Sequence, residues 1–151
     1  MRQIRRYKDE DLKACAAVLK EAFRGEPWRE NWSSDLADAR IQELMCSPLS
    51  MGYVFVEDDK IIGAAFGRRC TYLHGMEFFI DEMFVAPPFQ RTGIGSSLIK
   101  FMANDLWDMG FVDIVLNTER EYPSEMFYLK NGFRHRPKVV FLAKDLKEDD
   151  T

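Results

Sequence analysis

The sequence predicts an α/β fold, in the broad sense that includes α+β proteins, with a mixed sheet covered by helices on both faces. The chain has 151 residues and 46% of them are apolar, which is enough to bury the core of one ordinary domain. Segments typical of strands and helices follow one another in the order β-α-α-β-β-β-α-β-α-β, which implies that mixed sheet. No linker, repeat or low-complexity segment interrupts them, so we expect residues 1–151 to form a single domain.

The first half of the chain predicts a strand, two helices and a hairpin. Asp9 is suited to cap the first helix, because its carboxylate accepts hydrogen bonds from the free amides of the first turn. Glycines 63 and 67 in the second arm of the hairpin indicate a bulge or a close approach of two backbones. The expected elements are a strand at 4–7, a helix ended by Gly25 and Pro27, a helix capped at Ser33 or Ser34 and stopped by Ser47-Pro48, and hairpin strands at 51–57 and 61–71.

The second half predicts three strands and two helices. Pro87 and Pro88 end the first of these strands, because proline cannot donate to a ladder of backbone hydrogen bonds. Gly110 suits the end of the long helix, and Pro123 suits the first turn of the short one. The expected elements are a strand at 77–85, a helix from 94, a strand at 113–118, a helix from 123 to 131 and a final strand at 139–143.

Composition and charge exclude several classes of protein. The formal net charge is −4 with no long basic run, so we expect no nucleic acid partner and a preference for cationic small substrates. The three cysteines, Cys15, Cys46 and Cys70, lack the spacing of metal ligands or of a disulfide framework. His74 and His135 lie far apart in sequence, so we expect no metal. The N-terminus has no apolar leader and no stretch is long enough to span a membrane, which predicts a cytoplasmic protein without membrane contact.

The residues from Gln90 to Gly95 read Gln-Arg-Thr-Gly-Ile-Gly and join a strand pattern to a helix pattern. Such a turn directs several backbone amides and the positive end of a helix dipole at one point, which suits a phosphate or pyrophosphate. Two known phosphate loops do not match: one needs a glycine-lysine pair, and the other needs a third glycine where Ser96 or Leu98 stands. A strand-to-helix turn without a ligand is the remaining alternative.

Two segments resemble the GCN5-related N-acetyltransferases, the GNAT superfamily. Residues 80–95, with the strand end, the prolines and the glycine turn, resemble the acetyl-CoA-binding segment of that family. Residues 126–133, Met-Phe-Tyr-Leu-Lys-Asn-Gly-Phe, resemble its second conserved segment, although Glu121 stands where the family often has asparagine. The order of elements also agrees with the family. The resemblance implies a mostly antiparallel, twisted sheet and acetyl-CoA as the cosubstrate.

The resemblance also implies which residues hold acetyl-CoA. The backbone amides from Arg91 to Ser96 would bind the pyrophosphate, and Met83 and Val85 would lie where a splayed strand binds the pantetheine. Tyr128 would face the sulfur of CoA. The implied cofactor-binding residues are Met83, Phe84, Val85, Gln90, Arg91, Thr92, Gly93, Ile94, Gly95, Ser96 and Phe127.

Acetylation of an amine needs a way to remove a proton from the ammonium and a donor for the departing thiolate. Side chains alternate along a strand, so Asp81 is expected to share a face with Met83 and Val85, and Glu82 to lie on the other face. We therefore rank Asp81 first and Glu82 second as the base or the ammonium ligand. Tyr128 is expected to donate a hydrogen bond to the sulfur.

The segment between the first two helices is rich in acids and tryptophan, and by resemblance it borders the acceptor pocket. Glu26, Trp28 and Trp32, together with Asp81, are the expected acceptor-binding residues, because they suit a cationic, partly apolar amine. No serine or cysteine has the setting of an activated nucleophile, which favours direct transfer in a ternary complex.

The predicted function is therefore acetyl-CoA-dependent acetylation of a primary amine on a small cationic molecule. Three alternatives stay open: an inactive GNAT fold that binds CoA as a sensor or interaction module, an enzyme acting on a protein or peptide amine, and a nucleotide-binding turn. The resemblance also leaves a homodimer through the sheet edge open.

Overall fold

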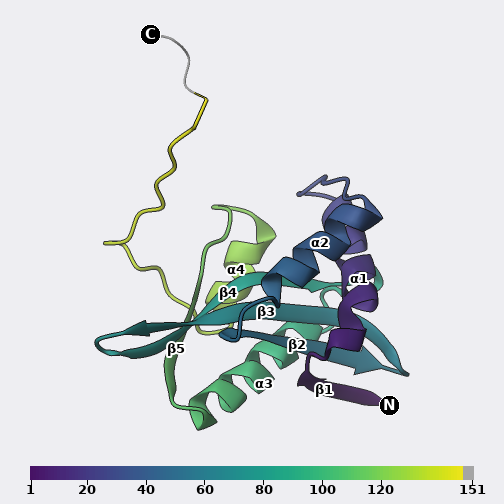
Figure 1. Ribbon diagram of the computed structural model, residues 1–151, viewed down its shortest axis with the longest axis horizontal. Coiled ribbons are helices and arrows are strands. Elements are labelled where there is room, and N and C mark those ends of the chain that lie inside the picture. The colour runs from purple at the N-terminus through teal and green to yellow at the C-terminus, as the bar shows by residue number, and fades with distance from the viewer. Residues whose placement is uncertain (148–151) are drawn as a thin grey trace.

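The computed structural model describes residues 1–147, which form one five-stranded sheet with helices on both faces (Figure 1). None of the helices within this range is long and apolar enough to cross a membrane. The elements in chain order are β1 (Arg2–Arg6), a short 3-10 turn η1 (Asp9–Asp11), α1 (Leu12–Arg24), α2 (Ser34–Leu44), β2 (Ser50–Glu57), β3 (Lys60–Tyr72), β4 (Gly75–Val85), η2 (Pro87–Phe89), α3 (Ile94–Asp108), β5 (Phe111–Leu116) and α4 (Pro123–Lys130).

The sheet is mixed and mostly antiparallel, as expected. Its strands lie in the order β1-β2-β3-β4-β5, and every neighbouring pair is antiparallel except β4 and β5. The parallel pair is joined through α3, because two parallel strands cannot be connected by a tight hairpin. The predicted α/β class is therefore confirmed.

Two apolar cores lie on opposite faces of the sheet. α1 and α2 cover one face, where Leu19, Ile41 and Phe84 are buried. α3 covers the other face with Leu98 and Met102, and aromatic side chains of α4 pack against this second core. Ser33 caps α2 as expected, because its hydroxyl accepts a 3.1 Å hydrogen bond from the amide of Leu36. The expected cap at Asp9 was wrong: Asp9 lies in η1, and α1 begins at Leu12 without a side-chain cap hydrogen bond.

A bulge in β4 changes which side chains face each core. The pairing passes from Phe66 opposite Glu82 to Gly67 opposite Ile80, so Asp81 has no partner on β3. Ile80 consequently packs in the same core as Met83 and Val85. The expectation of uninterrupted alternation through this strand was therefore wrong, because one extra residue shifts the facing of all those beyond it.

Gly67 allows the close backbone approach at this bulge. A Cβ atom there would lie 2.4 Å from the carbonyl oxygen of Phe79 and 2.5 Å from the ring of Phe78. The expectation of a bulge or close approach in this arm of the hairpin is therefore confirmed.

We expect Gly67→Ala to lower the free energy of unfolding by about 2 kcal/mol or more, because backbone cannot move aside as a flexible side chain can. Gly25→Ala is the matched control, since a Cβ at Gly25 meets nothing within 4 Å. Urea unfolding of both variants measures the difference, and equal stability of the two would contradict the predicted clash.

The final strand expected at 139–143 is absent. The chain from Val139 to Ala143 has no regular structure, and its apolar side chains are exposed. Five consecutive apolar residues have a strong strand propensity, but a strand forms only where another strand pairs with it.

Candidate functional site

The turn between β4 and α3 is shaped by its own side chains. The side-chain nitrogen Nε2 of Gln90 donates a 2.9 Å hydrogen bond to the carbonyl of Val85, and the Thr92 hydroxyl donates to the carbonyl of Phe89. Gly93 has a φ of 87°, in the left-handed region that favours glycine. These contacts fold the segment from Gln90 to Gly93 tightly against the end of β4, directly before the helix.

The first turn of α3 has amides without an acceptor in the helix. The first hydrogen bond within the helix joins the amide of Ser97 to the carbonyl of Gly93 at 3.0 Å, so the amides of residues 94–96 have no acceptor in the helix. Gly93 and Ser96 are exposed. With the positive end of a 15-residue helix behind them, these amides suit an anion.

The strand that leads to this turn is unpaired on one side. β4 pairs with β5 only from Met76 to Ile80, while β4 itself continues to Val85. The two strands therefore separate, and within residues 1–147 the stretch from Glu82 to Val85 has a strand neighbour only in β3. This is the arrangement that the family resemblance implies for an extended ligand lying between the two strands.

Gly95 brings the two halves of the site together. A Cβ atom at this position would lie 2.8 Å from Cζ of Phe127 and 3.8 Å from Cε of Met83. The absence of a side chain at Gly95 thus lets the ring of Phe127 in α4 pack directly against the first turn of α3. The glycine turn, β4 and the aromatic segment of α4 meet here, although they are distant in sequence.

Tyr128 is the next residue in α4. Its ring makes edge-to-face contacts with Phe127 at 5.1 Å and with Phe133 at 5.3 Å between ring centroids. Burial raises the pKa of Tyr128, and the negative charge of Glu82 raises it further. The hydroxyl therefore stays protonated, and it has no hydrogen-bond partner among residues 1–147, so it is free to donate to a ligand.

Glu82 is the carboxylate whose charge acts on Tyr128. Its side chain is 20% exposed and accepts a 3.1 Å hydrogen bond from Nε of Arg40 in α2. Burial raises the pKa of Glu82, Arg40 opposes that shift, and the charges of Glu30 and Asp81 add to it. A carboxyl group with a raised pKa is a better proton acceptor than a free one, because its affinity for a proton is greater.

Asp81, at the bulge, has a different partner. Its carboxylate pairs with Nε of Arg68 in β3 at 3.2 Å, and the same guanidinium lies over the ring of Phe79 at 4.8 Å from the centroid. Asp81 influences the site through its charge on Glu82. The charge of Glu82 thus acts on Tyr128, whereas the carboxylate of Asp81 is paired with Arg68.

The expected acceptor residues of the loop after α1 fall into two groups, the two tryptophans and Glu26. The ring of Trp28 meets that of Tyr122, which precedes α4, edge to face with 4.9 Å between centroids, so it connects the loop after α1 to the start of α4. Trp32 donates a 2.9 Å hydrogen bond to Glu30. Glu26 is exposed and pairs with Arg29, and no contact connects it to Glu82.

Sequence reasoning missed Arg40 and Tyr122. A signal for Arg40 existed, since it lies three residues after Ala37 and four before Leu44 on the buried face of α2. A charged residue on such a face indicates a buried partner of opposite charge. No comparable local signal marks Tyr122.

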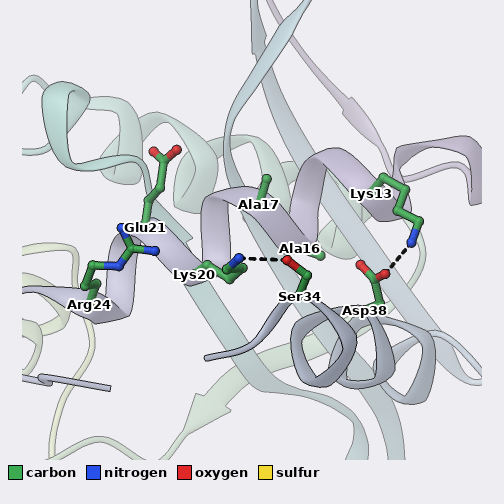
Figure 2. Close-up of a pocket in the computed structure, with 8 residues that line it drawn as sticks. All are labelled: Lys13, Ala16, Ala17, Lys20, Glu21, Arg24, Ser34 and Asp38. Atoms are coloured by element: carbon green, nitrogen blue, oxygen red, sulfur yellow. Dashed lines mark hydrogen bonds and ion pairs between the residues drawn. The ribbon is translucent and has the colours of Figure 1, made fainter. Parts of the chain in front are cut away.

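A surface pocket of about 290 Å³ lies elsewhere, between α1 and α2 (Figure 2). The Lys20 ammonium donates a 2.8 Å hydrogen bond to the Ser34 hydroxyl, and Lys13 pairs with Asp38, so four of its polar side chains are paired across the groove. None of the predicted site residues lines it. We interpret it as the groove between two packed helices.

His74 lies close to two carboxylates, which its place in the sequence did not suggest. Ligand atoms of His74, Glu77 and Asp113 lie within 4.8 Å of one another. Arg136 reaches Glu77 at 3.0 Å and Asp113 at 2.7 Å, so its guanidinium supplies the positive charge that two adjacent carboxylates need.

A family model described as an acetyltransferase (GNAT) domain matches residues 49–135, more than half of the chain. The chain belongs to the GNAT superfamily. The matched region of this GNAT domain contains both sequence segments and all the elements from β2 to α4. No curated protein matches the chain.

Solved structures similar to this GNAT chain share its fold at low sequence identity. The aminoglycoside N-acetyltransferase AAC(6')-Iy, solved with a bisubstrate analogue of CoA and acetylneamine, has a TM-score of 0.74 at 21% identity, over 96% of this chain and 99% of the other. A possible acetyltransferase from Clostridium difficile 630 has a TM-score of 0.81 at 16% identity, over 97% and 99%. Glucosamine-6-phosphate N-acetyltransferase from Arabidopsis thaliana has a TM-score of 0.69 at 18% identity, over 97% and 99%.

Proposed function

We propose that the chain transfers an acetyl group from acetyl-CoA to a primary amine of a small cationic molecule, directly within a ternary complex. The contact of Gly95 with Phe127 is the observation that supports this most strongly. Through this contact the first turn of α3, which suits an anion, lies beside the aromatic segment that carries Tyr128. Acetyl-CoA needs both, one for its pyrophosphate and the other for its reactive thioester.

In this proposal the chain binds the donor through backbone groups. The amides of residues 94–96 hold the pyrophosphate, and the unpaired side of β4 near Met83 and Val85 binds the pantetheine by main-chain hydrogen bonds. Arg91, exposed and with a φ of 62°, adds a positive side chain beside the phosphates.

The acceptor enters from the face of α2 and the loop after α1. Glu82 and Glu30 attract an ammonium, and Trp28 and Trp32 provide apolar contacts and cation–π contacts. The attacking nitrogen forms a bond to the acetyl carbon as the carbon–sulfur bond breaks. The proton of the amine passes to Glu82, directly or through water, and Tyr128 donates a hydrogen bond to the departing sulfur.

A thiol-release assay with acetyl-CoA tests this function across polyamines, aminoglycosides, amino acids and peptides. We expect turnover with a small molecule that carries more than one ammonium group. Tight CoA binding without turnover on any amine would favour a sensor or interaction module, and turnover restricted to peptides would favour a protein substrate. Competition of acetyl-CoA with ATP and NAD tests the nucleotide alternative, and preferred binding of either nucleotide would contradict a CoA site.

We expect Gly95→Ala to raise the Kd for CoA about tenfold, because overpacking against Phe127 costs about 1–3 kcal/mol and displaces the first turn of α3. Adding Phe127→Leu to this variant should recover part of the affinity, since a smaller side chain makes room for the Cβ. Isothermal titration with CoA measures both. Unchanged affinity in Gly95→Ala would show that the turn does not hold CoA.

A further inference from the structure

The guanidinium of Arg40 in α2 bridges two carboxylates. Its Nε donates a 3.1 Å hydrogen bond to Oε2 of Glu82 in β4. Its Nη1 donates a 3.0 Å hydrogen bond to Oε1 of Glu43, three residues further along the same helix. One cation therefore joins a carboxylate at the acceptor side of the site to a second carboxylate on the outer surface of α2.

The two carboxylates differ in their surroundings. The Glu82 side chain is 20% exposed, whereas the Glu43 side chain is 72% exposed. Water and salt therefore screen the pair of Arg40 with Glu43 much more than its pair with Glu82. Because a guanidinium on an exposed partner keeps most of its hydration, Glu43 is able to hold Arg40 at little cost once Arg40 has left Glu82.

Charged and titratable groups surround Glu82 on several sides. They are Arg40 in α2, Asp81 in β4, Glu30 in the loop after α1, Tyr128 in α4 and, through its pair with Asp81, Arg68 in β3. Glu30 and Asp81 are negative, so Arg40 is the cation that offsets them at Glu82. An acceptor ammonium that binds Glu82 consequently meets a like charge on the same carboxylate, in surroundings that screen the repulsion poorly.

The proposed chemistry makes two opposite demands on Glu82. Before the acceptor binds, its carboxylate must be ionised to attract an ammonium, and a paired guanidinium favours the ionised form. During acetyl transfer the same carboxylate must accept a proton, and a paired guanidinium opposes this. A cation that holds Glu82 at first and then leaves it would meet both demands, and Glu43 offers that cation a second position.

On the basis of the proposed acetyl transfer, we propose that Arg40 is a positioning residue that acts through Glu82. It pairs with Glu82 in the free protein, gives its place there to the acceptor ammonium, and stays on Glu43 in the complex. The exchange needs only a rotation of the Arg40 side chain, since Nη1 is already bonded to Glu43. Once Arg40 has left, no guanidinium opposes the transfer of the proton to Glu82.

Arg40→Gln tests the exchange through the pH dependence of two kinetic parameters. The value of kcat/KM reports the pKa of Glu82 in the free protein, and kcat reports it in the complex with the acceptor. Because Arg40 holds the pKa of Glu82 down in the free protein, its loss should move the low-pH fall of kcat/KM upward by about one pH unit or more. The low-pH fall of kcat should stay in place, because Arg40 has already left Glu82 in the complex.

The KM for the amine should move in opposite directions in two variants. Glu43→Gln removes the second position of Arg40, so the acceptor displaces Arg40 less easily and KM should rise about threefold. Arg40→Gln removes the competing cation, so KM should drop about threefold at a pH above the low-pH fall. The matched control is Arg2→Gln, which removes the same charge from a pair with Glu57 at the far edge of the sheet and should keep KM within about twofold.

The assay uses saturating acetyl-CoA and the amine with the fastest thiol release. Equal shifts of kcat/KM and kcat in Arg40→Gln would overturn the exchange, since Arg40 would then remain on Glu82 in the complex. So would the absence of any shift, or a KM that moves in the same direction in Arg40→Gln and Glu43→Gln. Glu43→Gln alters an exposed side chain, so its KM still decides the proposal if a thermal melt shows Arg40→Gln to be unfolded. A wild type that acetylates no amine would instead refute the proposed function, and this role with it.

Discussion

Replacing Tyr128 with phenylalanine is expected to lower kcat for acetyl transfer about 100-fold, while the Kd for CoA stays nearly unchanged. The phenylalanine ring keeps the edge-to-face packing with Phe127 and Phe133 and loses only the hydroxyl. Because burial and Glu82 raise the pKa of Tyr128, the hydroxyl donates a hydrogen bond more readily than it gives up its proton. Its loss therefore removes stabilisation that develops as the sulfur gains charge, and steady-state kinetics with CoA titration separates this effect from binding.

Tyr72→Phe is the matched control, since Tyr72 is an exposed tyrosine at the β3–β4 hairpin. It makes the same chemical change away from the site, and we expect kcat within about twofold of the wild type. An undiminished kcat in Tyr128→Phe would remove this hydroxyl from the mechanism.

Local sequence signals predicted most of the fold because they act within a few residues. Pro87 ends β4 wherever that strand lies, Ser33 caps α2 through its own hydroxyl, and the glycines after Gln90 form the turn that precedes α3. The packing of this turn against α4 requires that residue 95 be a glycine, since a side chain there would clash with Phe127. From the sequence, only the family resemblance indicated that the turn and α4 lie together.

Features that depend on a partner strand were not predictable in the same way. The bulge at Asp81 lies in a stretch of β4 without glycine or proline, and the residue that permits it, Gly67, belongs to β3. The segment at 139–143 has the propensity of a strand but no strand beside it in a single chain. In both cases the expectation from the local sequence was wrong, because strand pairing decides the outcome.

Replacing Glu82 with glutamine is expected to lower kcat/KM for the amine by about 100-fold or more. Glutamine keeps the size of the side chain but cannot accept the proton of the ammonium. Arg40 retains a partner, since it also pairs with Glu43 at 3.0 Å, so the fold should tolerate the change. A thermal melt of the variant checks that tolerance, and initial rates at saturating acetyl-CoA measure the loss.

The pH dependence of the rate gives the sharper test of Glu82. Only the ionised carboxylate can accept a proton, and burial raises the pKa of Glu82, so the wild-type rate should fall as the pH drops through that raised value. Glutamine does not titrate, and the low-pH fall should therefore be missing from its profile. Asp81→Asn is the matched control: because Asp81 pairs with Arg68, we expect it to keep the low-pH fall and to lose less activity. If Asp81→Asn instead lost more activity and its low-pH fall, Asp81 would be the base, as simple alternation along β4 predicts, and Glu82 would act only as a ligand for the ammonium.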